Sequence, residues 1–154
     1  MNKDFINPFL SSVMNVLSTM ARIDARPAKP ILKQDALARG DVTGFIGMTS
    51  EKAKGSLAIT FPQAVIFAIG KNMLGETLTE LDATETDLVG EFTNMVTGGA
   101  KRQLAEEGFD FDMATPAVIS GMGHEISHKV DGPRLTMGFG SEHGRAVIEI
   151  CFDR

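Results

Sequence analysis

Apolar side chains recur every three or four residues between positions 84 and 106, a spacing that marks one face of an amphipathic α-helix. The apolar face contains Leu88, Val89, Phe92, Met95, Val96, Gly99 and Ala100. The other side is a polar stripe that contains Asp87, Glu91, Asn94, Gly98 and Lys101. The pattern predicts a long helix that buries its apolar face and leaves the polar stripe in solvent.

Two adjacent glycines, Gly98 and Gly99, weaken this predicted helix, because a glycine in a helix interior costs about 1 kcal/mol relative to alanine. Gly99 belongs to the apolar face, where the missing side chain favours close packing of another element. Gly98 belongs to the polar stripe, one turn beyond Asn94, where the missing side chain lets another backbone or protein approach. The pair therefore indicates that close contacts matter here more than helix propensity.

The chain before this helix begins with a second helical pattern. Pro8 suits the first position of a helix, and the helical spacing of the apolar residues after it continues to about Arg22. Pro27 and Pro30 prevent that helix from continuing, and residues 31–37 are expected to form an extended edge segment.

Two strand pairs are predicted from alternating apolar and polar positions. The first pair is 42–49 with 54–61, and the second is 133–140 with 145–152. A helix at 63–74, closed by Gly75, follows the first pair, and a polar connection at 76–83 leads to the long helix.

Shorter extended segments are expected at 108–113 and, after Pro116, at 117–120. Each half of the chain then runs helix, extended segment, hairpin. The order predicts an α/β (α+β) fold in which a mostly antiparallel sheet packs against long helices, with two halves related by a pseudo-two-fold axis.

The composition is that of an ordinary globular protein and favours one domain over residues 1–154, with 43% apolar and 23% charged residues. A net charge of −5 and scattered basic residues argue against nucleic-acid binding. The single cysteine, Cys151, excludes an internal disulfide. No apolar run reaches the roughly 18 residues of a membrane span, and the N-terminus lacks a signal-peptide pattern, so we expect a cytoplasmic protein without a membrane partner.

Glu91 and Asn94 are three residues apart and are therefore neighbours on the helix surface. Taken alone, an exposed Glu and Asn on an amphipathic helix indicate no more than a solvated face. The pair is part of a longer pattern: Asp87, three residues, Glu91, two residues, Asn94, then 21 residues and Pro116. The longer pattern gives the pair a second interpretation.

The pattern resembles the signature of the CheC/CheX/FliY family of chemotaxis phosphatases, which is Asp or Ser, three residues, Glu, two residues, Asn, about 22 residues and Pro. The run GEFTNMVTGGAK at 90–101 is similar to the CheX branch, as is INPFLSSVMNVLSTM at 6–20. The spacing between Asn94 and Pro116 is one residue shorter than in the signature, and the difference falls in a predicted connection between elements.

The resemblance implies hydrolysis of the aspartyl phosphate on a response regulator of the CheY type. In the family, the residue at Asn94 aims the attacking water and the residue at Glu91 pairs with the regulator's lysine. We expect Asp87, Gly98 and Lys101 to contact the partner, although Asp87 could equally be a first-turn acid that the helix dipole favours. The resemblance also implies no cofactor of the protein's own, magnesium supplied by the regulator, and a homodimer. A non-catalytic regulator-binding or flagellar-switch module is the alternative that keeps the fold.

Some family members carry two sites, and the first helix is where a second one would lie. That helix offers Asn15, but Ser12 stands where the carboxylate would be. We therefore expect one working site, on the later helix.

A different chemistry is suggested by the run His124 to His128, which matches the H-E-x-x-H motif of zinc hydrolases. That motif binds zinc when both histidines share one face of a sustained helix. Here Gly121 and Gly123 precede it, and the sequence Asp-Gly-Pro at 131–133 ends any helix soon after. We expect strand or loop residues near the surface and no metal site.

Overall fold

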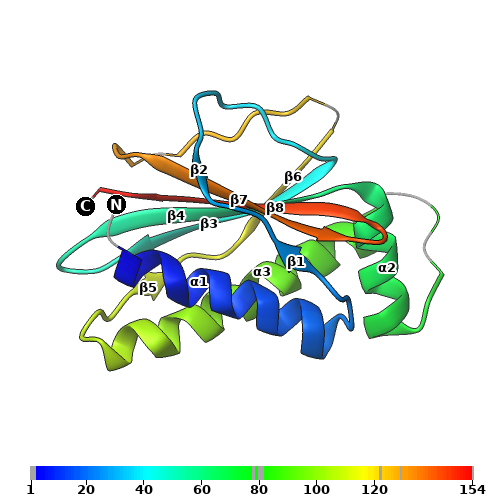
Figure 1. Cartoon of the computed structure of the whole chain (residues 1–154), viewed down its shortest axis with the longest axis horizontal. Coiled ribbons are helices and arrows are strands. Elements are labelled where there is room, and N and C mark those ends of the chain that lie inside the picture. Colours follow the sequence, from blue (N-terminus) through cyan, green and yellow to red (C-terminus); the bar gives the residue numbers. More distant parts are fainter. Residues whose placement is uncertain (1–2, 78, 80–81, 122, 129, 154) are drawn as a thin grey trace.

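An antiparallel sheet with helices on one face and loops on the other forms the body of the protein (Figure 1). The structure is a computed structural model that describes residues 3–77, 79, 82–121, 123–128 and 130–153. Its helices are α1 (Lys3–Asn15), a π-helical turn (Val16–Met20), α2 (Gln63–Leu74) and α3 (Ala83–Glu106). Its strands are β1 (Arg26–Pro27), β2 (Ile31–Leu32), β3 (Val42–Thr49), β4 (Lys54–Phe61), β5 (Asp112–Met113), β6 (Ala117–Ser120), β7 (Arg134–Ser141) and β8 (Gly144–Phe152).

The sheet order is β1-β7-β8-β4-β3-β5, with β2 also paired to β7 and β6 also paired to β3. All of these pairings are antiparallel. Both predicted hairpins are confirmed, and α2 has the bounds that the sequence predicted, with Gly75 closing it in the left-handed region at φ 72°. The predicted fold class, an antiparallel sheet packed on helices, is confirmed.

The two halves of the chain are interlocked at the edges of the sheet. Strands β4 and β8 meet at its centre, in register from Gly55 opposite Phe152 to Thr60 opposite Val147. The extended strands β1 and β2 of the first half pair with β7 of the second half, while β6 of the second half pairs with β3 of the first. Helix α2 follows β4 and has no counterpart after β8 in the described chain.

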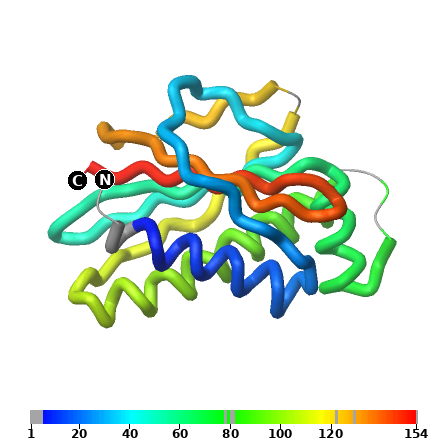
Figure 2. Tube along the Cα trace, in the orientation of Figure 1, coloured from blue at the N-terminus to red at the C-terminus, as the bar shows by residue number. Residues whose placement is uncertain are grey.

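Helices α1 and α3 lie side by side under one face of the sheet (Figures 1 and 2). Leu57, Ile59 and Phe61 of β4 face them and are almost completely buried. Phe61 meets Phe92 of α3 edge to face, with ring centroids 5.1 Å apart. This contact fixes the apolar face of α3 against the sheet. No helix in the described part of the chain is both long and apolar enough to cross a bilayer.

The other face of β4 is buried as well, although it is more polar. Ser56, Ala58 and Thr60 have relative exposures of 0–2% there. Two loop segments, at residues 33–41 and 123–128, cover this face (Figures 1 and 2). The sheet therefore lies between a helix layer and a loop layer.

The N-terminal segment differs from the sequence prediction in three places. The first helix begins at Lys3 and contains Pro8 in its interior, whereas the sequence prediction placed Pro8 at its first position. The first helix, expected to run to about Arg22, ends as an α-helix at Asn15 and continues as the π-helical turn. The extended segment expected at 31–37 pairs with β7 only over Ile31–Leu32, and Leu37 at its end forms an isolated antiparallel bridge with Glu125. Its partner β7 begins directly after Pro133, so the ladder ends there and the chain turns over the sheet face.

Helix α3 begins with a capping box that the sequence prediction did not identify. The Asp82 side chain accepts a hydrogen bond from Thr84 N at 2.9 Å, and the Glu85 carboxylate accepts one from Asp82 N at 2.6 Å. The side-chain contact with Glu85, followed by the hydrogen bond from the Thr84 backbone N–H, holds the pKa of Asp82 below its usual value. The sequence signal is Asp-x-x-Glu before an apolar run. Its first residue, Asp82, lies within the predicted connection at 76–83, part of which falls outside the described residues.

The capping box gives a test of how α3 begins. We expect Glu85→Ala to lower the free energy of unfolding by about 1 kcal/mol, because it leaves the backbone N–H of Asp82 without its partner. Glu85→Gln keeps an acceptor at the same place and should retain most of the stability. Urea unfolding of both variants measures the difference, and equal losses in the two would contradict the capping role.

Candidate active site on helix α3

The outward face of α3 displays the two residues that the sequence singled out. Glu91 and Asn94 are exposed, whereas Phe92 and Val96 beside them are buried. Residues three apart on a helix have Cβ atoms about 5–6 Å apart, so a carboxylate and a carboxamide are presented together. Both side chains are accessible to a partner.

The rest of the polar stripe lies along the same side of the helix. Asp87 and Gly98 are exposed and Lys101 is half-buried. At a rise of about 1.5 Å per residue, the stripe from Asp87 to Lys101 is roughly 21 Å long. It runs along the outer surface of a helix, so any reaction centre there must be completed by a second molecule.

The two glycines of α3 face opposite ways, as the sequence predicted. A Cβ on Gly98 would have no heavy atom within 4 Å, whereas a Cβ on Gly99 would lie 2.5 Å from Ser12 Oγ. Gly99 is therefore where α1 packs closely against α3, and Gly98 leaves open space beside Asn94. The space that a side chain at position 98 would occupy is open.

Buried hydroxyl groups hold the inner side of the same helix segment. Thr93 Oγ1 donates to Val89 O at 2.8 Å, and Thr97 Oγ1 contacts Thr93 O at 3.0 Å and Asn94 O at 3.1 Å. A Cβ on Gly44 of β3 would clash with the Thr93 hydroxyl, so the helix lies directly on the strand there. The backbone of Asn94 is thus supported from within the core.

Helix α1 does not present a second pair of this kind. Ser12 is buried at 4% exposure and its hydroxyl donates to Val96 O of α3 at 2.6 Å. Asn15 is exposed, and its backbone carbonyl accepts from Thr19 Oγ1 at 2.6 Å. The residues one turn from Asn15 on α1 and the π-helical turn are serines and a threonine, so no carboxylate stands beside its amide.

Pro116, the last residue of the sequence signature, precedes strand β6 next to α3. Val118 of that strand lies 3.7 Å from the position that a Cβ on Gly90 would take. The signature therefore joins one helix to the strand beside it.

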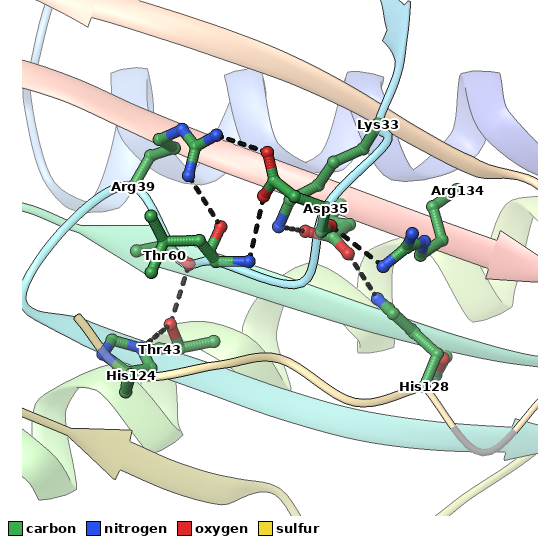
Figure 3. Close-up of polar contacts among 11 residues, drawn as sticks. Lys33, Asp35, Arg39, Thr43, Thr60, His124, His128 and Arg134 are labelled. Atoms are coloured by element: carbon green, nitrogen blue, oxygen red, sulfur yellow. Dashed lines mark hydrogen bonds and ion pairs between the residues drawn. The ribbon is translucent and has the colours of Figure 1, made fainter.

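The first histidine of the H-E-x-x-H run lies in a loop and is fully hydrogen-bonded. His124 Nδ1 donates to Gly121 O at 2.7 Å, and its Nε2 lies 2.6 Å from Thr43 Oγ1. Thr43 in turn bonds to Thr60 Oγ1 at 2.7 Å (Figure 3). Both ring nitrogens are occupied, so this residue has no nitrogen left for a metal.

The side chain of the second histidine is buried, although the residue as a whole is half-buried, so our expectation of a position near the surface was wrong for the side chain. The His128 side chain is 2% exposed, its Nε2 donates to Glu149 Oε1 at 2.8 Å, and its Nδ1 contacts the Ser56 hydroxyl. Lys33 Nζ pairs with the other oxygen of Glu149 at 2.5 Å. The polar face of the sheet offers hydroxyl and carboxylate partners that draw this ring inward.

The zinc-hydrolase alternative therefore lacks its geometry. The run 124–128 is not helical, and its two histidines lie apart, over different strands (Figure 3). Within the described residues, no three His, Cys, Asp or Glu side chains converge in a way that could hold a metal ion. The four-residue contact made by Lys33, Ser56, His128 and Glu149 instead fastens the loop layer to the sheet, and we call it the loop-face network.

Two buried groups of this region have shifted pKa values. Burial raises the pKa of Glu149, but hydrogen bonds from His128 and Lys33 and their charge lower it by more, so the pKa lies below the usual 4.5. Burial raises the pKa of the Cys151 thiol, which keeps it protonated and unreactive. Neither group touches the polar stripe of α3.

Comparison with known proteins identifies the family that the stripe resembles. The sequence model described as "Chemotaxis phosphatase CheX" matches residues 42–140, which is more than half of the chain. No curated protein matches the sequence significantly.

Three solved structures are similar over nearly the whole chain. A CheC-like superfamily protein from Shewanella sp. PV-4 has 56% identity and a TM-score of 0.94, covering 100% of both chains. The chemotaxis protein CheX from Vibrio vulnificus has 57% identity and a TM-score of 0.91, covering 97% of this chain and 99% of that one. The CheX–CheY–BeF3–Mg2+ complex from Borrelia burgdorferi has 24% identity and a TM-score of 0.82, covering 99% and 100%, and at this identity the likeness shows the fold alone.

The lowered pKa of Glu149 in the loop-face network predicts how the free energy of unfolding depends on pH in the acid range. A carboxyl group whose pKa is lowered by folding contributes stability that is present above its unfolded pKa, near 4.5, and lost as the pH falls through its folded pKa. We expect Glu149→Gln to lower the free energy of unfolding by roughly 2 kcal/mol at pH 7, because Lys33 loses its buried counter-charge.

The same variant should depend less on pH below 4.5 than the wild type. Urea unfolding at pH 7 and in the acid range measures both effects, with the exposed Glu125→Gln as the matched control. An unchanged acid dependence in Glu149→Gln would show that this carboxylate does not contribute as described.

Proposed function

The chain belongs to the CheX family of chemotaxis phosphatases, and we propose that it hydrolyses the aspartyl phosphate of a CheY-type response regulator with Glu91 and Asn94 of α3. The observation that carries this proposal is the exposed carboxylate and carboxamide, neighbours on a helix whose other side is fixed in the core. The exposed positions of both residues and the open space at Gly98 allow a partner protein to approach them. The residues themselves match the family signature in type and order.

The reaction needs no nucleophile or covalent intermediate from this protein, because its substrate is already activated. An aspartyl phosphate is a mixed anhydride, so water can attack its phosphorus once it is held in line with the bond to the aspartate oxygen. That bond breaks, the aspartate returns as a carboxylate, and inorganic phosphate leaves. Magnesium, held by the regulator, neutralises charge on the phosphoryl oxygens. The phosphatase itself has only to position the attacking water and the groups around it.

Asn94 suits the role of aiming the water. Its amide carries both a donor and an acceptor and adds no negative charge next to the phosphoryl group. The acceptor oxygen receives a hydrogen bond from the water, which turns a lone pair of the water oxygen toward phosphorus. The Thr97 hydroxyl donates to the Asn94 backbone carbonyl and so supports the backbone from which the amide projects.

Glu91 suits a contact with a cation of the partner. A carboxylate one turn from Asn94 pairs with the active-site lysine of the regulator and thereby sets the position of the helix over the phosphorylated pocket. Asp87, Gly98 and Lys101 extend the contact along the polar stripe. The solved complex of the Borrelia burgdorferi CheX with CheY, BeF3 and Mg2+ supports a partner of this class.

We place the protein in the cytoplasm with its regulator and treat residues 1–154 as one functional domain. We also propose a homodimer, which the family resemblance implies. Ile31 and Leu32, each 59% exposed on the edge strand β2, are consistent with a further contact surface away from the polar stripe. Dimer formation would then leave α3 accessible.

The central prediction concerns Asn94. We expect Asn94→Ala to reduce the accelerated dephosphorylation of a phosphorylated CheY-type regulator by about 100-fold, because the water is no longer aimed. The loss should appear in kcat, measured as phosphate release. Asn15→Ala removes the same side chain from an exposed position of α1 and should leave the rate unchanged.

Glu91→Ala separates docking from chemistry. It should raise KM and weaken binding of the regulator, because the lysine of the partner loses its carboxylate. A folded Asn94→Ala variant with a normal rate would disprove the assigned role. Tight binding by the wild type without any acceleration would instead favour the non-catalytic binding module.

The dimer is tested by light scattering on purified protein. We expect a mass of twice 16.6 kDa at micromolar concentration. A mass of 16.6 kDa that does not change with concentration would contradict the homodimer.

A further inference from the structure

Helices α1 and α3 approach each other most closely where Ser12 faces Gly99. The Ser12 hydroxyl is buried and donates to Val96 O of α3 at 2.6 Å, although the two residues are 84 positions apart. A Cβ on Gly99 would lie 2.5 Å from Ser12 Oγ and 3.4 Å from Ser12 Cβ. The first distance is shorter than real Cβ contacts, so the two helices interlock there without spare room.

This contact lies on the far side of the helix from Asn94, close to it along the helix axis. Val96 follows Asn94 by two residues and Gly99 follows it by five. On the sheet side, Thr93 lies directly against Gly44, where a Cβ would clash. The segment that carries Asn94 is therefore held at two points, by the sheet and by α1.

We propose that Ser12 and Gly99 form a positioning contact that sets where α3 presents Asn94 and Glu91. The inference rests on the proposed phosphatase function and names a part of the site that lies outside the polar stripe. Because a helix moves as a rigid rod, a side chain added at Gly99 displaces or rotates the exposed amide along with the buried face. Ser12 acts through α3 and does not touch the substrate.

Gly99→Ala distinguishes positioning from plain stability. Alanine favours the helix over glycine, so the substitution partly offsets the strain that it creates and the variant should fold. We expect kcat to fall about tenfold while KM stays within about twofold, because displacement of a water-aiming group affects the reacting state more than docking. Gly90→Ala is the matched control, because it makes the same change in the same helix. A Cβ at position 90 would lie 3.7 Å from the Val118 side chain, an ordinary van der Waals contact.

The double variant Ser12→Ala/Gly99→Ala is the decisive measurement. Removal of the Ser12 hydroxyl leaves the new Cβ 3.4 Å from the Cβ at position 12, a distance that the helices can accommodate. We expect kcat to recover to within about threefold of the wild type. A double variant that is no faster than Gly99→Ala, or a folded Gly99→Ala with normal kcat, would overturn the proposal.

A readout without the partner keeps this test separate from the phosphatase proposal. The side-chain amide signals of Asn94 in a ¹⁵N–¹H NMR spectrum should move in Gly99→Ala and return in the double variant. Unmoved signals in Gly99→Ala would overturn the positioning contact whatever the activity. A wild type that accelerates no dephosphorylation would end the proposed function alone, and the NMR comparison would still decide the contact.

Discussion

The burial of one side of α3 between the sheet and α1 is the constraint on which the rest of the molecule depends. The apolar side chains of this helix can leave water only on that side, where Phe92 meets Phe61 and the Thr93 hydroxyl lies against Gly44. Because that side is fixed against the core, the polar stripe on the opposite side of the helix faces solvent. The orientation of Glu91 and Asn94 is thus a consequence of core packing, and any change in the packing changes the surface.

The interlocked topology explains how one sheet supports the helix layer. Each half of the chain gives its extended strands to the hairpin of the other, so neither half can complete its sheet alone. The long-range contact between Ser12 and Val96 has the same character, since it joins the first helix of one half to the first helix of the other. The pseudo-two-fold arrangement therefore leaves α1 in a supporting place opposite α3.

Sequence patterns predicted the elements whose signals are local. The bounds of β3, β4 and α2, the closing Gly75 and the opposite orientations of Gly98 and Gly99 all follow from alternation, helical period or glycine chemistry. The capping box at Asp82 was within reach of the same reasoning, because its two residues stand three apart. The early end of the extended segment could not be predicted from its own sequence, because it depends on pairing with the strand that follows Pro133, which lies far along the chain from Ile31.

The loop layer was out of reach for a different physical reason. Its partners are 72 residues apart for Ser56 and His128 and 116 residues apart for Lys33 and Glu149, so no local pattern records them. The sequence at 124–128 therefore matches a zinc motif, although both of its histidines are hydrogen-bonded to the polar face of the sheet. A buried face lined with Ser, Thr and Glu must be satisfied by polar side chains from whatever covers it, and histidine does so with a donor and an acceptor on one rigid ring. The polar stripe on α3 is the reverse case: its groups need no partner within the chain, because water serves them until another protein arrives. The contrast between satisfied and unsatisfied polar groups, more than the residue types themselves, separates structure from function in this fold.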